Sequence, residues 1–179
     1  MDNNEICRRF DRLASDRTNI QSTWDLIEEY VTPYRGRFFK DNRSENSQEW
    51  RKRSIWDSTA VMAHQNLSAS LHGSITSPAI QWFDIRFRDE KLNKNKQAAV
   101  WLQNASERVY YELQDSNFNL EINETYQDVA GFGTAMVSQE SMNEDEWDGM
   151  TFSGVPLKEG YFEEDVQGRP RRFFRCFKW

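Results

Sequence analysis

The stretch that decides the fold runs from Trp50 to Phe87 and reads WRKRSIWDSTAVMAHQNLSASLHGSITSPAIQWFDIRF. Asp57 is a good N-cap residue, and a helical pattern over residues 57–75 follows it. The apolar side chains of this helix recur every three or four positions, at Ala60, Ala63, Leu67, Leu71 and Ile75. Pro78 cannot continue a helix, and beyond it apolar and charged residues alternate, which predicts a half-buried strand over residues 80–87.

Three motifs follow one another along the chain. The first, DSTAxxAxxxLxxxLxGxxTxPxxxWF, is carried by Asp57, Ser58, Thr59, Ala60, Ala63, Leu67, Leu71, Gly73, Thr76, Pro78, Trp82 and Phe83. The second joins Ser116-Asn117-Phe118, Tyr126-Gln127-Asp128-Val129 and Phe132-Gly133-Thr134-Ala135, and the third joins Tyr161 to Asp165 with Gly168, Arg169 and Arg172-Phe173. In this order, and over most of the chain, they resemble the N-terminal region of the podovirus-type head-to-tail connecting proteins, the portal proteins of short-tailed phages.

The bulk composition bounds the class of protein. The 179 residues suffice for one ordinary domain or two small lobes. A formal net charge of −6 argues against a general binder of polyanions and leaves local DNA contacts open. Cys7 and Cys176 lack the spacing of a zinc or redox motif, so we expect free thiols. No apolar run approaches about 18 residues, so no membrane span is predicted.

The first predicted helix has the clearest periodicity. Apolar residues follow 4-3-4-3 spacing at Ile6, Phe10, Leu13, Ile20, Trp24, Ile27 and Val31, and we call this set the seam. Arg17 occupies one position of the seam, and Pro33 fits a helix that ends near residues 30–32. Two interpretations are open: an amphipathic helix packed on its own domain, or a helix packed along another helix across a subunit boundary.

The rest of the chain predicts an α+β fold, with long N-terminal helices followed by a small, mostly antiparallel sheet. The expected elements are an exposed loop at 35–53, helices at 93–115 and 120–131, strands at 134–140, 150–155, 160–165 and 171–177, and a turn at 167–170. At least one of Gly131 and Gly133 should adopt a positive φ between helix and strand. We expect a mainly helical part at 1–133, with one strand near 80–87, and a β-rich part at 134–179. The latter should continue beyond the present C-terminus, because the family members are longer.

Catalytic and metal chemistry find little support in the sequence. His64 and His72 share a helix face without a partner that would orient them, which favours structural or hydrogen-bonding roles. Residues 144–149 imitate the start of a calcium loop, but Val155 stands where a bidentate Glu is needed. In the acidic run Glu163-Glu164-Asp165, adjacent strand residues point to opposite faces, so only Glu163 and Asp165 could converge on a two-metal nuclease site. We therefore predict no catalytic residue, no cofactor and no metal.

Two basic clusters offer contacts for anions. One is Arg51, Lys52 and Arg53, flanked by Trp50 and Trp56, and the other includes Arg169, Arg171, Arg172 and Arg175. Phosphate contacts and ion pairs between subunits are both open for these residues.

The resemblance implies a structural function. It implies a subunit of a ring, typically of twelve copies, at one capsid vertex of the virion, assembled in the host cytoplasm. Double-stranded DNA would pass through the ring, and capsid, terminase and tail or adaptor proteins would bind it; this chain would be the outer wing. A ring needs two unlike faces, and we expect one in the seam and the other near Trp82 and Phe83. Two alternatives remain open: a small adaptor or scaffold-binding module, and a metal-dependent phage nuclease.

Overall fold

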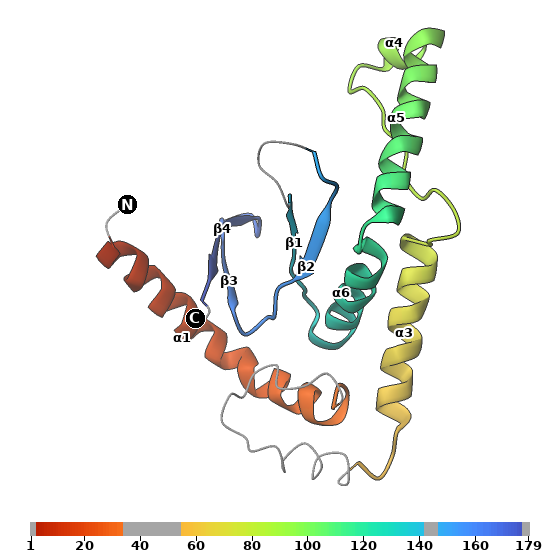
Figure 1. The fold of residues 1–179 in the computed structure, drawn as a ribbon. Helices are drawn as coiled ribbons and strands as arrows, with labels where there is room; N and C mark the ends of the chain where they lie inside the picture. The colour runs from red at the N-terminus through yellow and green to blue at the C-terminus, as the bar shows by residue number, and fades with distance from the viewer. Residues whose placement is uncertain (1–2, 34–54, 142–146, 177–179) are drawn as a thin grey trace. The chain divides into compact units, whose positions relative to one another are not determined.

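The computed structural model describes residues 3–33, 55–141 and 147–176 as an α+β fold, which confirms the predicted fold class (Figure 1). Its helices are α1 (Asn3–Tyr30), α3 (Thr59–Ile75), α4 (Glu90–Asn93), α5 (Lys96–Asp115) and α6 (Phe118–Phe132). Its strands are β1 (Val137–Glu140), β2 (Thr151–Gly154), β3 (Gly160–Glu164) and β4 (Pro170–Arg175). The strands form two separate antiparallel pairs, β1–β2 and β3–β4, rather than one sheet. The predicted loop at 35–53 lies outside the described residues.

The chain folds into two compact units that alternate along the sequence. Unit 1 comprises Met1–Asn66, Gln127–Met136 and Val155–Trp179, and unit 2 comprises Leu67–Tyr126 and Val137–Gly154. The predicted division of the chain near residue 133 into a helical and a β-rich domain stays a prediction.

In unit 1, α1 lies along β3 of the β3–β4 hairpin. The ring of Phe10 on α1 meets the ring of Tyr161 on β3 edge to face, with centroids 4.8 Å apart. The turn between the strands is built by Asp165, whose Oδ1 accepts hydrogen bonds from the backbone N–H groups of Gln167 and Arg169. Gly168 supplies the positive φ of 73° that this turn requires. The predicted hairpin is therefore present.

In unit 2, the residues before α4 are extended, but they pair with no strand among the described residues. The predicted strand at 80–87 is therefore wrong. Side chains take the place of a partner strand: Ser106 Oγ accepts the N–H of Ile85 at 2.9 Å. Asn93 accepts the N–H of Phe87 and donates to its carbonyl, both at 2.9 Å. Alternating polarity indicates that a segment is extended and half-buried, but it does not show which groups form hydrogen bonds with its backbone N–H and C=O groups.

The helix α3 begins and ends near the predicted positions but buries a neighbouring face, shifted by one residue and so by about 100° around the helix. Asp57 accepts hydrogen bonds from the hydroxyl of Thr59 at 2.6 Å and from its backbone N–H at 2.8 Å. These bonds lower the pKa of the Asp57 carboxyl, and the bond from the hydroxyl has the larger effect. The buried side chains are Val61, His64 and Ser68, whereas Leu67 and Ile75 of the predicted stripe are exposed. Small and polar residues form the packed face, so hydrophobic spacing pointed to the wrong side.

The end of α6 confirms the prediction for its glycines. Gly133 has a φ of 78°, in the left-handed region that ends helices. Gly131 lies close to other parts of unit 1, since a Cβ built there would be 3.3 Å from Nε2 of His64. Not every apolar side chain near the end of this helix is packed, because Val129 is 40% exposed.

The apolar core formed by the described residues is small. The buried hydrophobic residues among those described are Val61, Leu102, Phe132, Val155 and Leu157. Large apolar side chains elsewhere are solvent-exposed, including Trp56, Ile20 and Trp101 at 96, 51 and 60%. Exposed apolar surface of this kind is typical of proteins that associate with partners.

Candidate interaction surfaces

The seam divides into residues that pack within the chain and residues that do not. Phe10, Leu13, Trp24, Ile27 and Val31 are half-buried, whereas Ile6 and Ile20 are exposed. Trp24 packs edge to face against Phe132, and its indole N–H donates to the Phe132 carbonyl at 3.2 Å. Much of the seam therefore packs inside unit 1, and its outer residues are available to a partner.

Arg17, which interrupts the seam, anchors α1 to the hairpin. Its guanidinium lies 5.1 Å from the ring centroid of Trp24 and 4.7 Å from that of Tyr161. It also donates to the carbonyls of Lys158 and Gly160, each at 3.3 Å. Burial lowers the pKa of this guanidinium. In the sequence, Arg17 stood out as a charged residue at an apolar position of the seam. The structure shows that it contacts the rings of Trp24 and Tyr161.

Glu163 lies between two arginines on the surface of unit 1. Its Oε2 accepts hydrogen bonds from Arg172 at 2.9 Å and from Arg9 at 3.3 Å. The pKa of Glu163 lies below its ordinary value of 4.5, chiefly because of the Arg172 hydrogen bond. Asp165 serves the turn, so the predicted pair of Glu163 and Asp165 does not come together as free carboxylates. Among the described residues, no group of three or more His, Cys, Asp or Glu side chains is arranged to hold a metal ion.

The second predicted face, at Trp82 and Phe83, forms part of an aromatic ladder in unit 2. Trp82 is 37% exposed and Phe83 is half-buried, and their centroids are 4.9 Å apart. Trp82 stacks on Phe118 at 6.0 Å, and Phe118 meets Phe152 edge to face at 5.2 Å. Trp82 is therefore held in place by Phe83 and Phe118 while part of its ring remains exposed to solvent.

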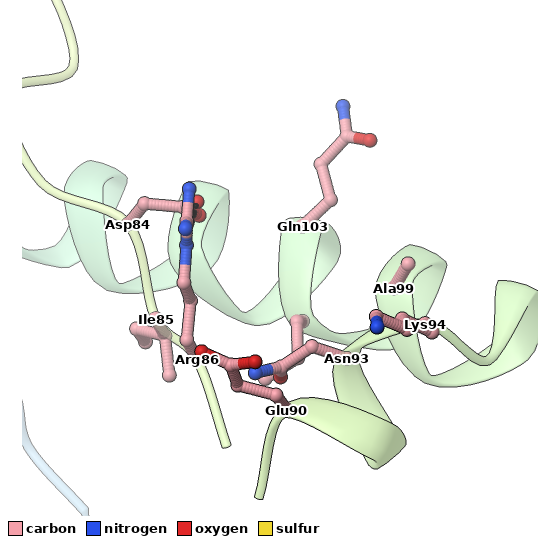
Figure 2. Close-up of a pocket in the computed structure, with 9 residues that line it drawn as sticks. Asp84, Ile85, Arg86, Glu90, Asn93, Lys94, Ala99 and Gln103 are labelled. Atoms are coloured by element: carbon pink, nitrogen blue, oxygen red, sulfur yellow. Dashed lines mark hydrogen bonds and ion pairs between the residues drawn. The ribbon is translucent and has the colours of Figure 1, made fainter. Parts of the chain in front are cut away.

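A cavity of about 610 Å³ lies in unit 2 between residues 84–86 and the helices α4 and α5 (Figure 2). Ile85 and Leu102 line it with apolar surface, and the charges of Arg86 and Lys94 are balanced by Asp84 and Glu90. Sequence reasoning missed this site. The signal available was a run of five basic residues within 86–96, in a chain whose net charge is −6.

The other predicted residues are placed as follows. Arg51, Lys52 and Arg53 lie outside the described residues. Arg171 is exposed, and Arg172 is committed to Glu163. His64 has a hydrogen-bonding role, as predicted: its Nε2 lies 2.8 Å from the Gln127 carbonyl and must carry the proton, because a carbonyl only accepts. Within the described part of the chain, no helix is both long and apolar enough to cross a membrane.

Among the described residues, a small apolar core combined with exposed aromatic side chains is typical of a protein that associates with partners. Comparison with known proteins identifies the family. The chain belongs to the family of bacteriophage head to tail connecting proteins, whose model matches residues 3–179.

Two relatives support this assignment. The chain is 28% identical over 174 residues to the probable portal protein of Bordetella phage BPP-1, covering 97% of this chain and 30% of that protein. It is 24% identical over 172 residues to the portal protein of Salmonella phage epsilon15, covering 96% of this chain and 30% of that protein. The chain therefore spans about 30% of the length of these relatives.

Proposed function

We propose that this chain is the wing portion of a portal subunit, which forms the ring at one capsid vertex through which viral DNA is packaged and ejected and to which the tail attaches. The observation that carries the proposal is the family match over residues 3–179, joined to two relatives that are both portal proteins. The partners are further copies of the subunit, typically twelve, together with capsid, terminase and tail or adaptor proteins, and double-stranded DNA.

The mechanism is positional rather than catalytic. A closed ring of identical subunits joins two unlike faces of each copy, so every subunit must carry two complementary surfaces. The exposed residues of the seam, Ile6 and Ile20, would contribute to one face in unit 1. Trp82, supported by the aromatic ladder, would contribute to another in unit 2. Interfaces of obligate assemblies bury on the order of 2,000 Å² or more, which accounts for the apolar surface that the isolated chain exposes.

The nuclease alternative loses its best support. A two-metal site needs carboxylate oxygens that are free to coordinate cations. Glu163 is already engaged by Arg172 and Arg9, and Asp165 Oδ1 accepts two backbone hydrogen bonds. The proposal therefore includes no hydrolytic activity.

The test uses the complete product of the gene that encodes this chain. Mass photometry and electron microscopy of the purified product are expected to show closed rings of a single size. Quantitative mass spectrometry of purified virions should find the product at the copy number of one ring per particle. A product that stays monomeric at all concentrations and is absent from virions would overturn the proposal, as would metal-dependent DNA cleavage that Asp165→Ala abolishes.

A further inference from the structure

The extended segment before α4 forms hydrogen bonds through the backbone of its odd-numbered residues. The Phe83 carbonyl accepts from the side chain two positions before it at 3.0 Å. The N–H of Ile85 donates to the Ser106 hydroxyl on α5 at 2.9 Å. Both backbone groups of Phe87 bond to the side chain of Asn93 on α4, each at 2.9 Å. These bonds hold one side of the segment against the two helices.

The even-numbered residues leave the other side of this segment open. Backbone groups of successive residues in an extended chain point to opposite sides, so those of Trp82, Asp84 and Arg86 point away from these partners. Among the described residues, no group forms a hydrogen bond with their backbone N–H or C=O. All three residues are exposed. The segment therefore has one unpaired edge that another strand can reach.

A second unpaired edge lies on β1. In an antiparallel ladder, pairs that exchange backbone hydrogen bonds alternate with pairs that do not. The N–H of Val155 donates to the Met136 carbonyl, so the adjacent pair of Val137 and Gly154 is one that does not exchange them. By the same alternation, Val137 and Gln139 turn their backbone groups outward from β2. Within the described part of the chain, nothing bonds to these groups.

The outer edges of β2 and β3 are already occupied. Asn117 bonds to both backbone groups of Phe152, and Glu121 accepts the N–H of Gly154 at 2.7 Å, which closes β2. The helix α1 lies along β3, and its Arg17 donates to the first carbonyl of that strand. Neither strand can accept another strand at these positions.

The composition of the two remaining strands favours β1 as an accepting edge. The strand β4 contains Pro170 and three arginines and has a register shift opposite Glu163 and Glu164, which are features that protect an edge from pairing. The strand β1 reads VSQE, has no proline or basic residue, and keeps a continuous register. We propose that β1 of one copy pairs with residues 82–86 of a second copy of this chain through backbone hydrogen bonds.

The two edges have complementary properties. Each presents N–H and C=O groups at every second residue, as strand addition to a sheet edge requires. They do not pair with each other within one copy. Residues 82–88 carry a net charge of +1, from Arg86 and Arg88 against Asp84, and β1 carries −1 at Glu140. The segment also begins at Trp82, in the surface already proposed to join subunits.

This contact rests on the proposed ring-forming function and deepens it. Each copy offers β1 to one neighbour and residues 82–86 to the other. Such a head-to-tail contact generates a ring when its rotation closes. Backbone pairing also supplies affinity from groups that every residue carries, so it depends little on the exposed side chains along the edge.

Hydrogen–deuterium exchange at single-residue resolution tests the contact in the complete gene product. The assembled ring is compared with the monomer obtained by dilution. The outward amides are expected to exchange about tenfold or more slowly in the ring, at Asp84, Arg86, Val137 and Gln139. The matched control is the amide of Ile85, which is bonded within one copy and should change much less.

Two proline substitutions remove outward N–H groups and leave the β1–β2 hydrogen bonds in place. Gln139→Pro and Arg86→Pro should each weaken self-association by about tenfold or more in sedimentation velocity, because proline removes the donor and obstructs an approaching strand. The matched controls Gln139→Ala and Arg86→Ala keep the N–H and should associate as the wild type does. Thermal unfolding checks the fold of each variant, and exchange in the wild type decides the question where a variant does not fold.

The outcomes separate this contact from the ring function. Normal association of both proline variants, or rings whose outward amides stay unprotected, would overturn the contact and leave the portal assignment standing. Protection of β1 without protection of residues 84–86 would also contradict it, as would protection already present in the monomer or found only in virions. Equal losses in the alanine variants would show a side-chain contact instead. A wild-type product that forms no oligomer overturns both proposals.

Discussion

Arg172 on β4 and Glu163 on β3 are direct cross-strand partners, joined by a hydrogen bond of 2.9 Å between Nη1 and Oε2. Arg9 of α1 reaches the same oxygen at 3.3 Å, so one carboxylate ties the helix to both strands of the hairpin. The side chains of Glu163 and Arg172 are 29 and 36% exposed, which keeps the contribution of this pair modest.

The stability of unit 1 should fall in acid because of Glu163. Its pKa is lower in the folded chain than the ordinary value of 4.5, so the folded state binds fewer protons than the unfolded state in that range. The contribution is present above pH 4.5 and is lost as the pH falls through the folded pKa. Urea denaturation across pH should show Glu163→Gln less stable than the wild type at neutral pH, with the difference closing in acid. Glu164→Gln, at an exposed neighbour, should show no such convergence, and equal pH profiles for all three chains would contradict the prediction.

Trp24 should contribute to stability through both its ring and its N–H. Trp24→Ala is expected to cost about 2–3 kcal/mol, below the range for fully buried aromatic residues, because Trp24 is half-buried. Trp24→Phe keeps most of the apolar contact but loses the hydrogen bond to Phe132, for about 1 kcal/mol. Chemical denaturation measures both. The control Trp56→Ala, at a side chain 96% exposed, should change stability by less than about 0.5 kcal/mol.

Asn117 should hold β2 in place. Its amide donates to the Phe152 carbonyl at 2.7 Å, and its oxygen accepts the Phe152 N–H at 2.8 Å. Asn117→Ala leaves both backbone groups without their partner and should cost about 2–3 kcal/mol in thermal or urea unfolding. Asn119→Ala removes one bond between side chains, to Gln114, and should cost about 1 kcal/mol or less. A smaller loss of stability for Asn117→Ala than for Asn119→Ala would contradict the prediction and would show that water replaces the two hydrogen bonds between Asn117 and Phe152.

Two glycines should respond in opposite directions to the same substitution. Gly133 has a φ of 78°, so Gly133→Ala should destabilise the chain by about 1–2 kcal/mol through backbone strain. Gly73 lies inside α3, and nothing lies within 4 Å of the position that an alanine Cβ would take there. Gly73→Ala should therefore stabilise the helix by about 0.5–1 kcal/mol. Thermal unfolding of the two variants side by side tests both, and shifts of the same sign would contradict one of them.

Local signals in the sequence predicted those elements whose cause is local. The seam and Pro33 predicted α1, which ends at Tyr30, and Asp57 and Pro78 bracketed α3. The β3–β4 hairpin followed from alternation on both sides of Gly168. The interface role of the seam and of Trp82 and Phe83 stays a prediction, although the structure places Phe10 and Trp24 against partners within the chain.

The sequence by itself determined the four long helices to within a few residues, the β3–β4 hairpin and the family, because capping, turn formation and motif order depend on neighbours along the chain. The short helix α4 was not predicted. Only the tertiary structure decided that residues 80–87 meet side chains instead of a strand, that α3 buries His64 and Ser68, and that Arg17 stacks on Trp24 and Tyr161. The physical reason is that buried backbone groups and charges need hydrogen-bonding or ionic partners. The polarity pattern of a sequence shows which segments are half-buried, but it does not show which distant residues supply those partners. The cavity beside α4 belongs to the same class, since its lining residues lie up to 19 positions apart, from Asp84 to Gln103, and meet only when α4 and α5 pack.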